Sequence, residues 1–386
     1  MHTPTERVRR AKRSRIRTMF DLAEAQPPER DLVRLEVGEP DFDTPAHVVD
    51  AAAEAARAGA THYTSNAGLP ACRRAISDTL AREYGVQHDP DEVLVTVGGM
   101  EALLLAVLST VGPGEELVVP GPTWPNYETQ AALADAAFVE VPMPAETGYD
   151  LDADRVIEEL GPETGAVVLT TPSNPTGRVF DPAECRAVVE AAADCGAYVI
   201  ADEVYLGLSY DGDARGIAAE TGHPDHVLTV GSCSKTYAMT GWRLGWLAGD
   251  AHLLDEATKV RESTTACASS VAQHAAVAAL TGPQEPVREM KRAFERRRDL
   301  VVERIDAIDG LTAPRPEGAF YAFLDPAGVE DDMAFARTLL EEHGVVLAPG
   351  SGFGETGQGK LRLSFANSAE RLREGFDRIE RALAER

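Results

Sequence analysis

The stretch HVLTVGSCSKTYAMTGWRLGW, residues 226–246, joins an apolar run to a short polar turn that carries a lysine. HVLTVGS (226–232) has the composition of a buried strand, so Lys235 is expected just beyond the strand's carboxyl end. Open parallel sheets bind ligands outside the carboxyl ends of their strands. Most lysines are solvated surface residues, but this one is flanked by small hydroxyl residues, glycines and tryptophans, a poor surface composition. Lys235 is therefore a candidate for a residue that takes part in a reaction or binds a ligand.

The same organisation extends to both sides of this stretch, from about residue 45 to residue 285. Asp181, Pro182 and Glu184 have the order of a helix start, and Gly196 is expected to end the helix. Apolar runs predict strands, and helical patterns follow two of them: strands at 93–97, 116–120, 166–171, 198–205 and 226–232, helices at 98–111 and 182–196. Apolar strands alternating with helices predict an α/β fold, with a mostly parallel central sheet covered by helices.

The pattern changes after residue 286. Residues 287–305 form a long charged helical pattern, 318–323 and 360–365 have the composition of antiparallel strands, and the last segment has an apolar helical stripe. A chain of 386 residues exceeds a single core, so two domains are expected. We expect an N-terminal arm that joins the small domain (1–44), a large domain (45–285) and a C-terminal small α+β domain (286–386).

Composition limits the partners and the compartment. The net charge of −26 argues against nucleic acid, and no stretch approaches the ~20 apolar residues needed to cross a membrane. The same acidity suits a protein adapted to high salt, where charge repulsion is screened. Five cysteines without a CxxC pair predict neither a metal site nor a disulfide framework, and favour a reducing cytoplasm.

Seven further segments occur in a characteristic order around the lysine stretch. They are VGEPDFDTP (37–45), THYTSNAGLP (61–70), SNPTG (173–177), ADEVY (201–205), GAFY (318–321), PGSGFG (349–354) and LRLSFANS (361–368). Together they resemble the class I/II aminotransferases of fold type I, and most of all the archaeal and bacterial aspartate and aromatic enzymes. The resemblance implies pyridoxal 5'-phosphate (PLP) as cofactor, an amino acid and a 2-oxo acid as substrates, and a homodimer with shared active sites.

The resemblance also assigns roles around the cofactor ring. Lys235 would hold PLP as an imine and shuttle a proton, and Asp202 would pair with the pyridine nitrogen. Asn174 and Tyr205 would hold the phenolic oxygen, and Trp124 would stack on the ring. In the family the Asn174–Pro175 peptide bond is typically cis.

Phosphate and substrate contacts follow from the same motifs. The phosphate would be held by glycine-loop amides, hydroxyls and an arginine: Gly99, Met100, Ser232, Ser234 and Arg243, with Tyr63 reaching in from the neighbouring subunit. The substrate would meet Gly38, Trp124, Asn174 and Arg362, whose guanidinium would bind the α-carboxylate. Strand alternation alone, with Leu361, Leu363 and Phe365 on the other face, predicts a solvent-facing Arg362.

Three questions stay open at this point. A PLP-dependent carbon–sulfur β-lyase would share the Lys235 and Asp202 residue types. No motif identifies the amino donor, and Phe320 and Tyr321 could face an aromatic substrate or belong to the core. The basic residues between 7 and 17 are expected to lie on an acidic surface, either of this chain or of a dimer partner.

Overall fold

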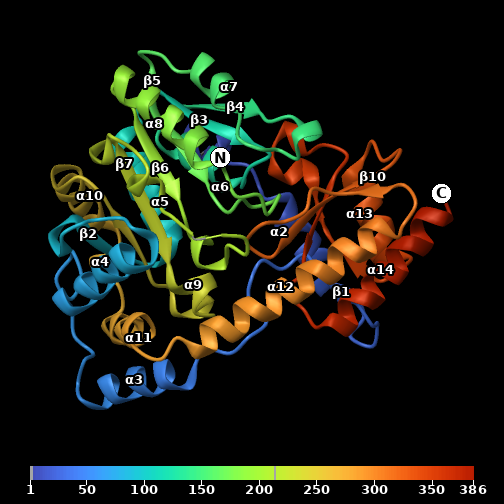
Figure 1. Cartoon of the computed structure of the whole chain (residues 1–386), viewed down its shortest axis with the longest axis horizontal. Coiled ribbons are helices and arrows are strands. Elements are labelled where there is room, and N and C mark those ends of the chain that lie inside the picture. Colours follow the sequence, from blue (N-terminus) through green and yellow to red (C-terminus); the bar gives the residue numbers. More distant parts are fainter. Residues whose placement is uncertain (1–2, 213) are drawn as a thin grey trace.

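The computed structural model describes residues 3–212 and 214–386. Two lobes lie side by side (Figure 1), and they are called the large domain and the small domain below. The large domain is built on a seven-stranded sheet in the order β2-β8-β7-β6-β5-β3-β4. Its strands are β2 (Val93–Thr96), β3 (Glu116–Gly121), β4 (Ala137–Pro142), β5 (Thr164–Thr170), β6 (Tyr198–Asp202), β7 (Val227–Ser232) and β8 (Gly245–Ala248). Strands β3 to β7 are parallel, and β8 is antiparallel to both β2 and β7. The predicted mostly parallel sheet is confirmed.

Helices cover both faces of this sheet because both faces of its strands are apolar. Along β5, Val167 and Leu169 belong to one buried cluster, and Ala166 and Val168 belong to another on the opposite face. The covering helices are α4 (Pro70–Tyr84), α5 (Gly98–Thr110), α6 (Asn126–Leu133), α7 (Ala153–Glu158), α8 (Pro182–Cys195) and α10 (Ala251–Thr264). Helix α11 (Ser270–Thr281) packs on α4, and α3 (Ala46–Arg57) packs on α11.

Helix α8 shows how local sequence sets an element's ends. The Asp181 carboxylate accepts a hydrogen bond from the Ala183 amide at 2.7 Å, and Gly196 ends the helix in the left-handed conformation at φ +82°. Glu184 does not turn back to the cap. Its carboxylate accepts from the Ala153 amide at 2.8 Å and so ties α8 to α7.

The small domain combines both ends of the chain. Its four-stranded antiparallel sheet has the order β12-β13-β10-β9, and β1 pairs in parallel with β11. Its elements are β1 (Val33–Arg34), α12 (Glu285–Asp306), β9 (Leu311–Thr312), β10 (Tyr321–Pro326), α13 (Asp332–Glu341), β11 (Val345–Val346), β12 (Ala348–Pro349), β13 (Leu361–Ser364) and α14 (Ala369–Ala384). The strand expected at 318–323 begins only at Tyr321, because Gly318 makes an isolated bridge to Ser209 instead.

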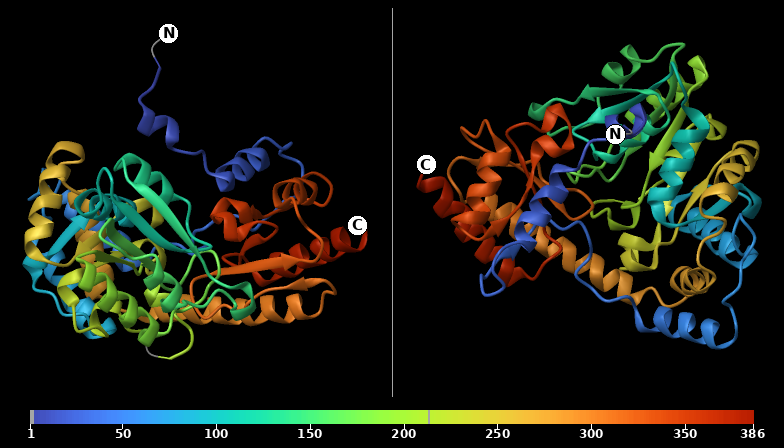
Figure 2. Two further views of the ribbon diagram at one scale, coloured as in Figure 1. Left: turned by 90° about the horizontal axis from the view of Figure 1, so that it is seen from above. Right: turned by 180° about the vertical axis from the view of Figure 1, so that it is seen from behind.

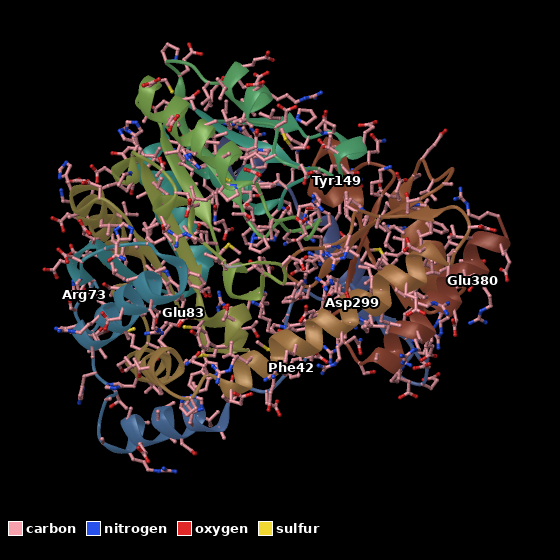
Figure 3. All side chains as sticks on the ribbon, viewed as in Figure 1. Phe42, Arg73, Glu83, Tyr149, Asp299 and Glu380 are labelled. Atoms are coloured by element: carbon pink, nitrogen blue, oxygen red, sulfur yellow. The ribbon has the colours of Figure 1, made fainter. Side chains whose placement is uncertain are left out.

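The long helix α12 connects the two domains (Figure 1). Beside it, Phe42 packs edge-on against Phe294 of α12, with ring centroids 5.5 Å apart (Figure 3). In the described parts of the chain, none of the helices has the length and apolarity that crossing a membrane requires.

The N-terminal arm, α1 (Glu6–Arg10) and α2 (Arg15–Glu24), lies across both domains (Figure 2). Helix α2 buries Met19 in the small-domain core. Helix α1 buries no residue, and its end of the arm is held to the large domain by ion pairs of 2.6 Å from Arg7 to Asp135 and from Lys12 to Glu128. The acidic surface under the basic arm is thus that of its own chain.

Candidate active site

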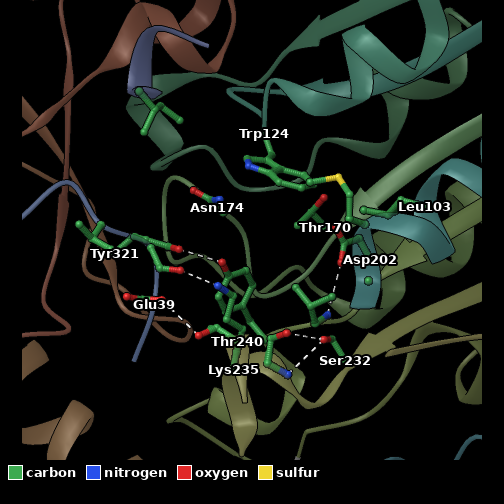
Figure 4. A pocket seen from close by; sticks show the side chains of 18 of the residues that line it. Glu39, Leu103, Trp124, Thr170, Asn174, Asp202, Ser232, Lys235, Thr240 and Tyr321 are labelled. Atoms are coloured by element: carbon green, nitrogen blue, oxygen red, sulfur yellow. Dashed lines mark hydrogen bonds between the residues drawn. The ribbon is translucent and has the colours of Figure 1, made fainter. Parts of the chain in front are cut away.

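A cavity of 470 Å³ opens between the arm, the small domain and the carboxyl ends of the central strands (Figure 4). Side chains of the arm, including Ile16, Arg17 and Phe20, form one wall. All predicted site residues except Tyr63 line this cavity: Gly38, Gly99, Met100, Trp124, Asn174, Asp202, Tyr205, Ser232, Ser234, Lys235, Arg243 and Arg362. Residues from both domains therefore meet at one place.

Lys235 lies in the short helix α9 (Cys233–Thr236), directly after β7. Its Nζ donates a hydrogen bond to the Gly38 carbonyl at 2.5 Å and lies 5.8 Å from the ring centroids of Tyr205 and Phe320. Burial among these groups lowers the pKa of Lys235 to about 8. A much larger fraction of this amine is neutral at pH 7 than of a free lysine, whose pKa is ~10.4.

Asp202 ends β6 and is buried. Its Oδ2 accepts a hydrogen bond from the Tyr127 hydroxyl at 2.5 Å, and Tyr127 also lies 2.8 Å from the Thr170 hydroxyl. Burial raises the pKa of Asp202 to about 6, although the bond from Tyr127 acts in the opposite direction. Among the described residues, no cation forms an ion pair with Asp202, so this buried carboxylate would favour a positively charged group placed against it.

Arg362 occupies the centre of the small-domain sheet, between β12 and β10. It is 3% exposed, so the solvent-facing position predicted from alternation is wrong: β13 is a central strand whose two faces are both covered. Its guanidinium donates to Asn174 Oδ1 at 3.0 Å and to the Glu36 carbonyl at 2.6 Å. Nε is buried and has no partner among the described residues, so these residues do not use all the donors of the guanidinium.

Two tyrosines line the wall beside Arg362. The Tyr205 and Tyr321 hydroxyls lie 2.8 Å apart, and the Tyr321 ring centroid lies 4.4 Å from the Arg362 Cζ. A Cβ on Gly38 would stand 2.6 Å from the Tyr321 hydroxyl, so a larger residue at this position would have to displace the Tyr321 side chain. Of the two aromatic residues left open by the sequence, Tyr321 lines the cavity and Phe320 is core.

Hydrogen-bond donors gather at the glycine-loop end of the cavity. Gly98 has φ +74°, and a Cβ there would stand 2.6 Å from Nη2 of Arg243. Arg243 is exposed and donates to the Thr240 carbonyl at 2.8 Å. The Ser232 hydroxyl caps α9 by accepting from the Ser234 amide at 3.1 Å. An arginine, two hydroxyls and the start of α5 form a donor set that suits an oxyanion.

Trp124 forms the wall opposite Lys235 (Figure 4) and packs edge-on against Tyr127 at 5.7 Å. Met100, at the start of α5, is partly exposed beside it. The predicted cis bond at Asn174–Pro175 is wrong: the cis bonds of the described residues are Gly121–Pro122 and Thr171–Pro172. No group of three or more His, Cys, Asp or Glu side chains in the described ranges could hold a metal ion.

One predicted site residue lies away from the cavity, and some residues of the cavity were not predicted from the sequence. Tyr63 is 91% exposed and does not line the cavity, so its role toward a second subunit stays a prediction. Sequence reasoning missed Tyr127, Thr170 and Glu39, whereas the arm segment 15–20 was expected near the entrance of the site from the resemblance and does line the cavity. Tyr127 had one detectable signal, since it follows Trp124 by three residues at a helix start.

Comparisons with known proteins agree with this geometry. The family described as aminotransferase class I and II matches residues 30–379. The aspartate aminotransferase of Pyrococcus horikoshii is 35% identical, covering 98% of this chain and 96% of that protein. The aromatic-amino-acid aminotransferase 2 of Thermococcus litoralis is 34% identical, over 99% and 98%. The structure of the Thermus thermophilus aspartate aminotransferase with maleate superposes with a TM-score of 0.94 at 36% identity, covering 99% of this chain and all of that one. This chain belongs to the class I and II aminotransferases, PLP-dependent enzymes of fold type I.

Proposed function

We propose that this chain transfers the amino group of an L-amino acid, aspartate or an aromatic one, to a 2-oxo acid such as 2-oxoglutarate. One observation carries the proposal: a buried guanidinium, a lysine amine of lowered pKa and a buried carboxylate surround one cavity, in Arg362, Lys235 and Asp202. The names of the relatives do not favour the β-lyase alternative.

The residues present fit PLP. Asp202 offers a buried carboxylate for the pyridine nitrogen, and Asn174 and Tyr205 offer polar groups for the phenolic oxygen. Trp124 offers a flat apolar face. The glycine-loop end offers donors for the phosphate: Gly99, Met100, Ser232, Ser234 and Arg243, with Tyr63 from a second copy. When bound, PLP supplies an electron-withdrawing ring that stabilises negative charge at the substrate α-carbon.

The chain's own groups would then handle the proton and the substrate. Lys235 Nζ, with its lowered pKa, would accept the proton of the substrate α-carbon and deliver it to the cofactor, as amino-group transfer requires. Arg362 and the Gly38 backbone would bind the α-carboxylate, with Asn174 holding the guanidinium from one side at 3.0 Å and Trp124 bounding the substrate from another. The small domain, formed by residues 1–44 and 286–386, would close on the large domain of residues 45–285 and exclude water from the site.

The active unit we propose is a homodimer in the cytoplasm. Tyr63 supports the dimer, because a tyrosine that is 91% exposed on a well-held loop is placed for contact with another copy. The five cysteines support a reducing compartment, since all of them are unpaired.

A donor panel tests the proposal. Purified holoenzyme is mixed with single L-amino acids and no oxo acid, and the visible absorption of the bound cofactor is followed. Aspartate or an aromatic amino acid should convert it to the pyridoxamine form, and 2-oxoglutarate should then restore it and yield glutamate. If no donor converts the cofactor, the proposal is wrong. Pyruvate and ammonia released from cystathionine without an oxo acid would indicate the lyase.

A further inference from the structure

Arg261 of α10 is a fully buried arginine with an unusual set of contacts. Its Nη1 donates to the Asn66 carbonyl at 2.7 Å and to the Val95 carbonyl at the end of β2. Its Nε and Nη2 are buried and have no hydrogen-bond partner among the described residues. Burying a charge with unsatisfied hydrogen-bond donors costs free energy and contributes little to the stability of the fold. A role in stability alone therefore accounts poorly for an arginine at this position.

One side of Arg261 holds the loop that carries Tyr63. Asn66 belongs to this loop, residues 60–69, and its side chain also donates to Glu262 at 2.8 Å. The loop is held at both ends as well, because Ser270 donates to the Ala60 carbonyl at 2.6 Å and Gln273 accepts from the Leu69 amide at 2.6 Å. Tyr63 is thus an exposed residue on a loop that is held in place by hydrogen bonds at both of its ends and at Asn66.

The other side of Arg261 reaches the glycine loop, residues 97–99. Its Nε lies 3.9 Å from Oε1 of Glu101, in the first turn of α5. Glu101 Oε2 accepts from the Val97 amide at 2.5 Å, and its other oxygen accepts from the Thr265 hydroxyl. A chain of polar contacts therefore runs from Asn66 through Arg261 and Glu101 to the residue before Gly98.

We propose that Arg261, with Glu101, is a positioning pair that couples the Tyr63 loop to the glycine loop. Docking of a second copy on Tyr63 and occupation of the glycine loop by the cofactor phosphate would then favour one another, because such coupling is reciprocal. The inference rests on the proposed cofactor and dimer, and neither residue lines the cavity. Arg261 and Glu101 act on the cofactor only through the two loops.

A double-mutant cycle on cofactor affinity tests the coupling. The Kd of PLP is measured by titrating cofactor-free enzyme, with and without Tyr63→Ala, in three backgrounds: wild type, Glu101→Gln/Arg261→Met, and Arg298→Met. The double change removes both buried charges, so neither is left unpaired. Arg298→Met is the control, since Arg298 is also a buried arginine and lies in α12 of the small domain. Melting temperatures report stability separately.

In the wild type, Tyr63→Ala should raise the Kd about 10-fold, as for a lost hydrogen bond to a charged group. In the Glu101→Gln/Arg261→Met background its effect should fall below about threefold, since coupled residues are not additive. The control should keep the full Tyr63 effect even if its melting temperature falls as much. If the double variant does not fold, Arg261→Lys replaces it, with a partial loss expected.

An equal Tyr63→Ala effect in all three backgrounds would overturn the coupling, and so would a Tyr63→Ala variant that binds PLP like the wild type. Either result leaves the proposed function intact. A wild-type chain that binds no PLP would instead contradict the proposed function itself, so the two failures are distinguishable.

Discussion

Replacing Arg362 by glutamine tests how the site would recognise an amino acid. The guanidinium contacts Asn174 and the Glu36 carbonyl and keeps a buried Nε without a partner. A bidentate arginine–carboxylate contact consists of two charge-assisted hydrogen bonds, each worth ~1.5–3 kcal/mol. Their loss is worth about 3–6 kcal/mol. Because a glutamine amide retains part of the bonding, we expect kcat/KM for the amino donor to fall ~10²–10³-fold.

The assay compares two donors in single-turnover reactions of the holoenzyme. One is the preferred L-amino acid, and the other is the amine that lacks its α-carboxylate. Arg362→Gln should slow the amino acid by the factor above and change the slow reaction of the amine less than about threefold, because the amine never used the guanidinium. The matched control is Arg304→Gln, the same substitution on α12 at a residue whose partners are Asp377 and Glu380. It should leave both donors unchanged.

Two results would refute this reasoning. A loss of less than about fivefold for the amino acid would show that the carboxylate is bound elsewhere. An equal loss for both donors would show that Arg362 supports the sheet and not the substrate. The melting temperature of each variant separates this second case from general unfolding.

Four further predictions follow from the same site. The rate of PLP uptake by the cofactor-free protein should rise about tenfold per pH unit below the Lys235 pKa of about 8 and level off above it, since only the neutral amine attacks an aldehyde; a flat pH profile would contradict this. Gly38→Ala should lower kcat/KM about 10-fold with little change in melting temperature, because the added Cβ meets the Tyr321 hydroxyl at 2.6 Å and displaces that side chain in the cavity wall. Wild-type kinetics would show that the displacement of Tyr321 does not affect the substrate. The melting temperature should rise between low and molar KCl, since salt screens the net charge of −26; an unchanged value would exclude adaptation to salt. Mixing inactive Lys235→Ala subunits with Tyr63→Ala subunits should raise the activity above that of either variant alone, because one site of each hybrid keeps both residues; no gain on subunit exchange would argue against shared sites.

Continuous apolar strands were the predictable part of the fold. β5 and β7 lie within about two residues of their predicted ranges. A strand that is buried on both faces is a continuous apolar run, so it can be recognised from its own sequence alone. β4 and β8 were not predicted. β4 is an edge strand of mixed exposure, and β8 is only four residues long and begins at the end of the lysine stretch. Edge position and brevity both weaken the signal on which strand prediction relies.

The site shows the same division. Lys235 and Asp202 were identifiable in part from their positions at strand ends, which depend only on local sequence. Arg362 was misjudged by alternation, because whether a strand's second face meets solvent depends on what packs there. Tyr127 was overlooked because its partner, Asp202, lies 75 residues away in the chain. Contacts that cross between strands and domains are a property of the fold and leave little trace in the local pattern.

The segment 36–44 explains how residues from two domains keep a defined spacing. The Glu36 carbonyl accepts from Arg362, and two residues later the Gly38 carbonyl accepts from Lys235. Further along, the Thr44 hydroxyl donates to the Ala238 carbonyl at 2.6 Å, in the loop after the lysine. Arg362, the proposed group for the α-carboxylate, and Lys235, the proposed group for the amine, are thus tied to one short stretch of backbone. Their separation depends on three consecutive residues more than on how the domains dock. Substitutions in the domain interface should therefore change the rate of closure more than the preference for α-amino acids.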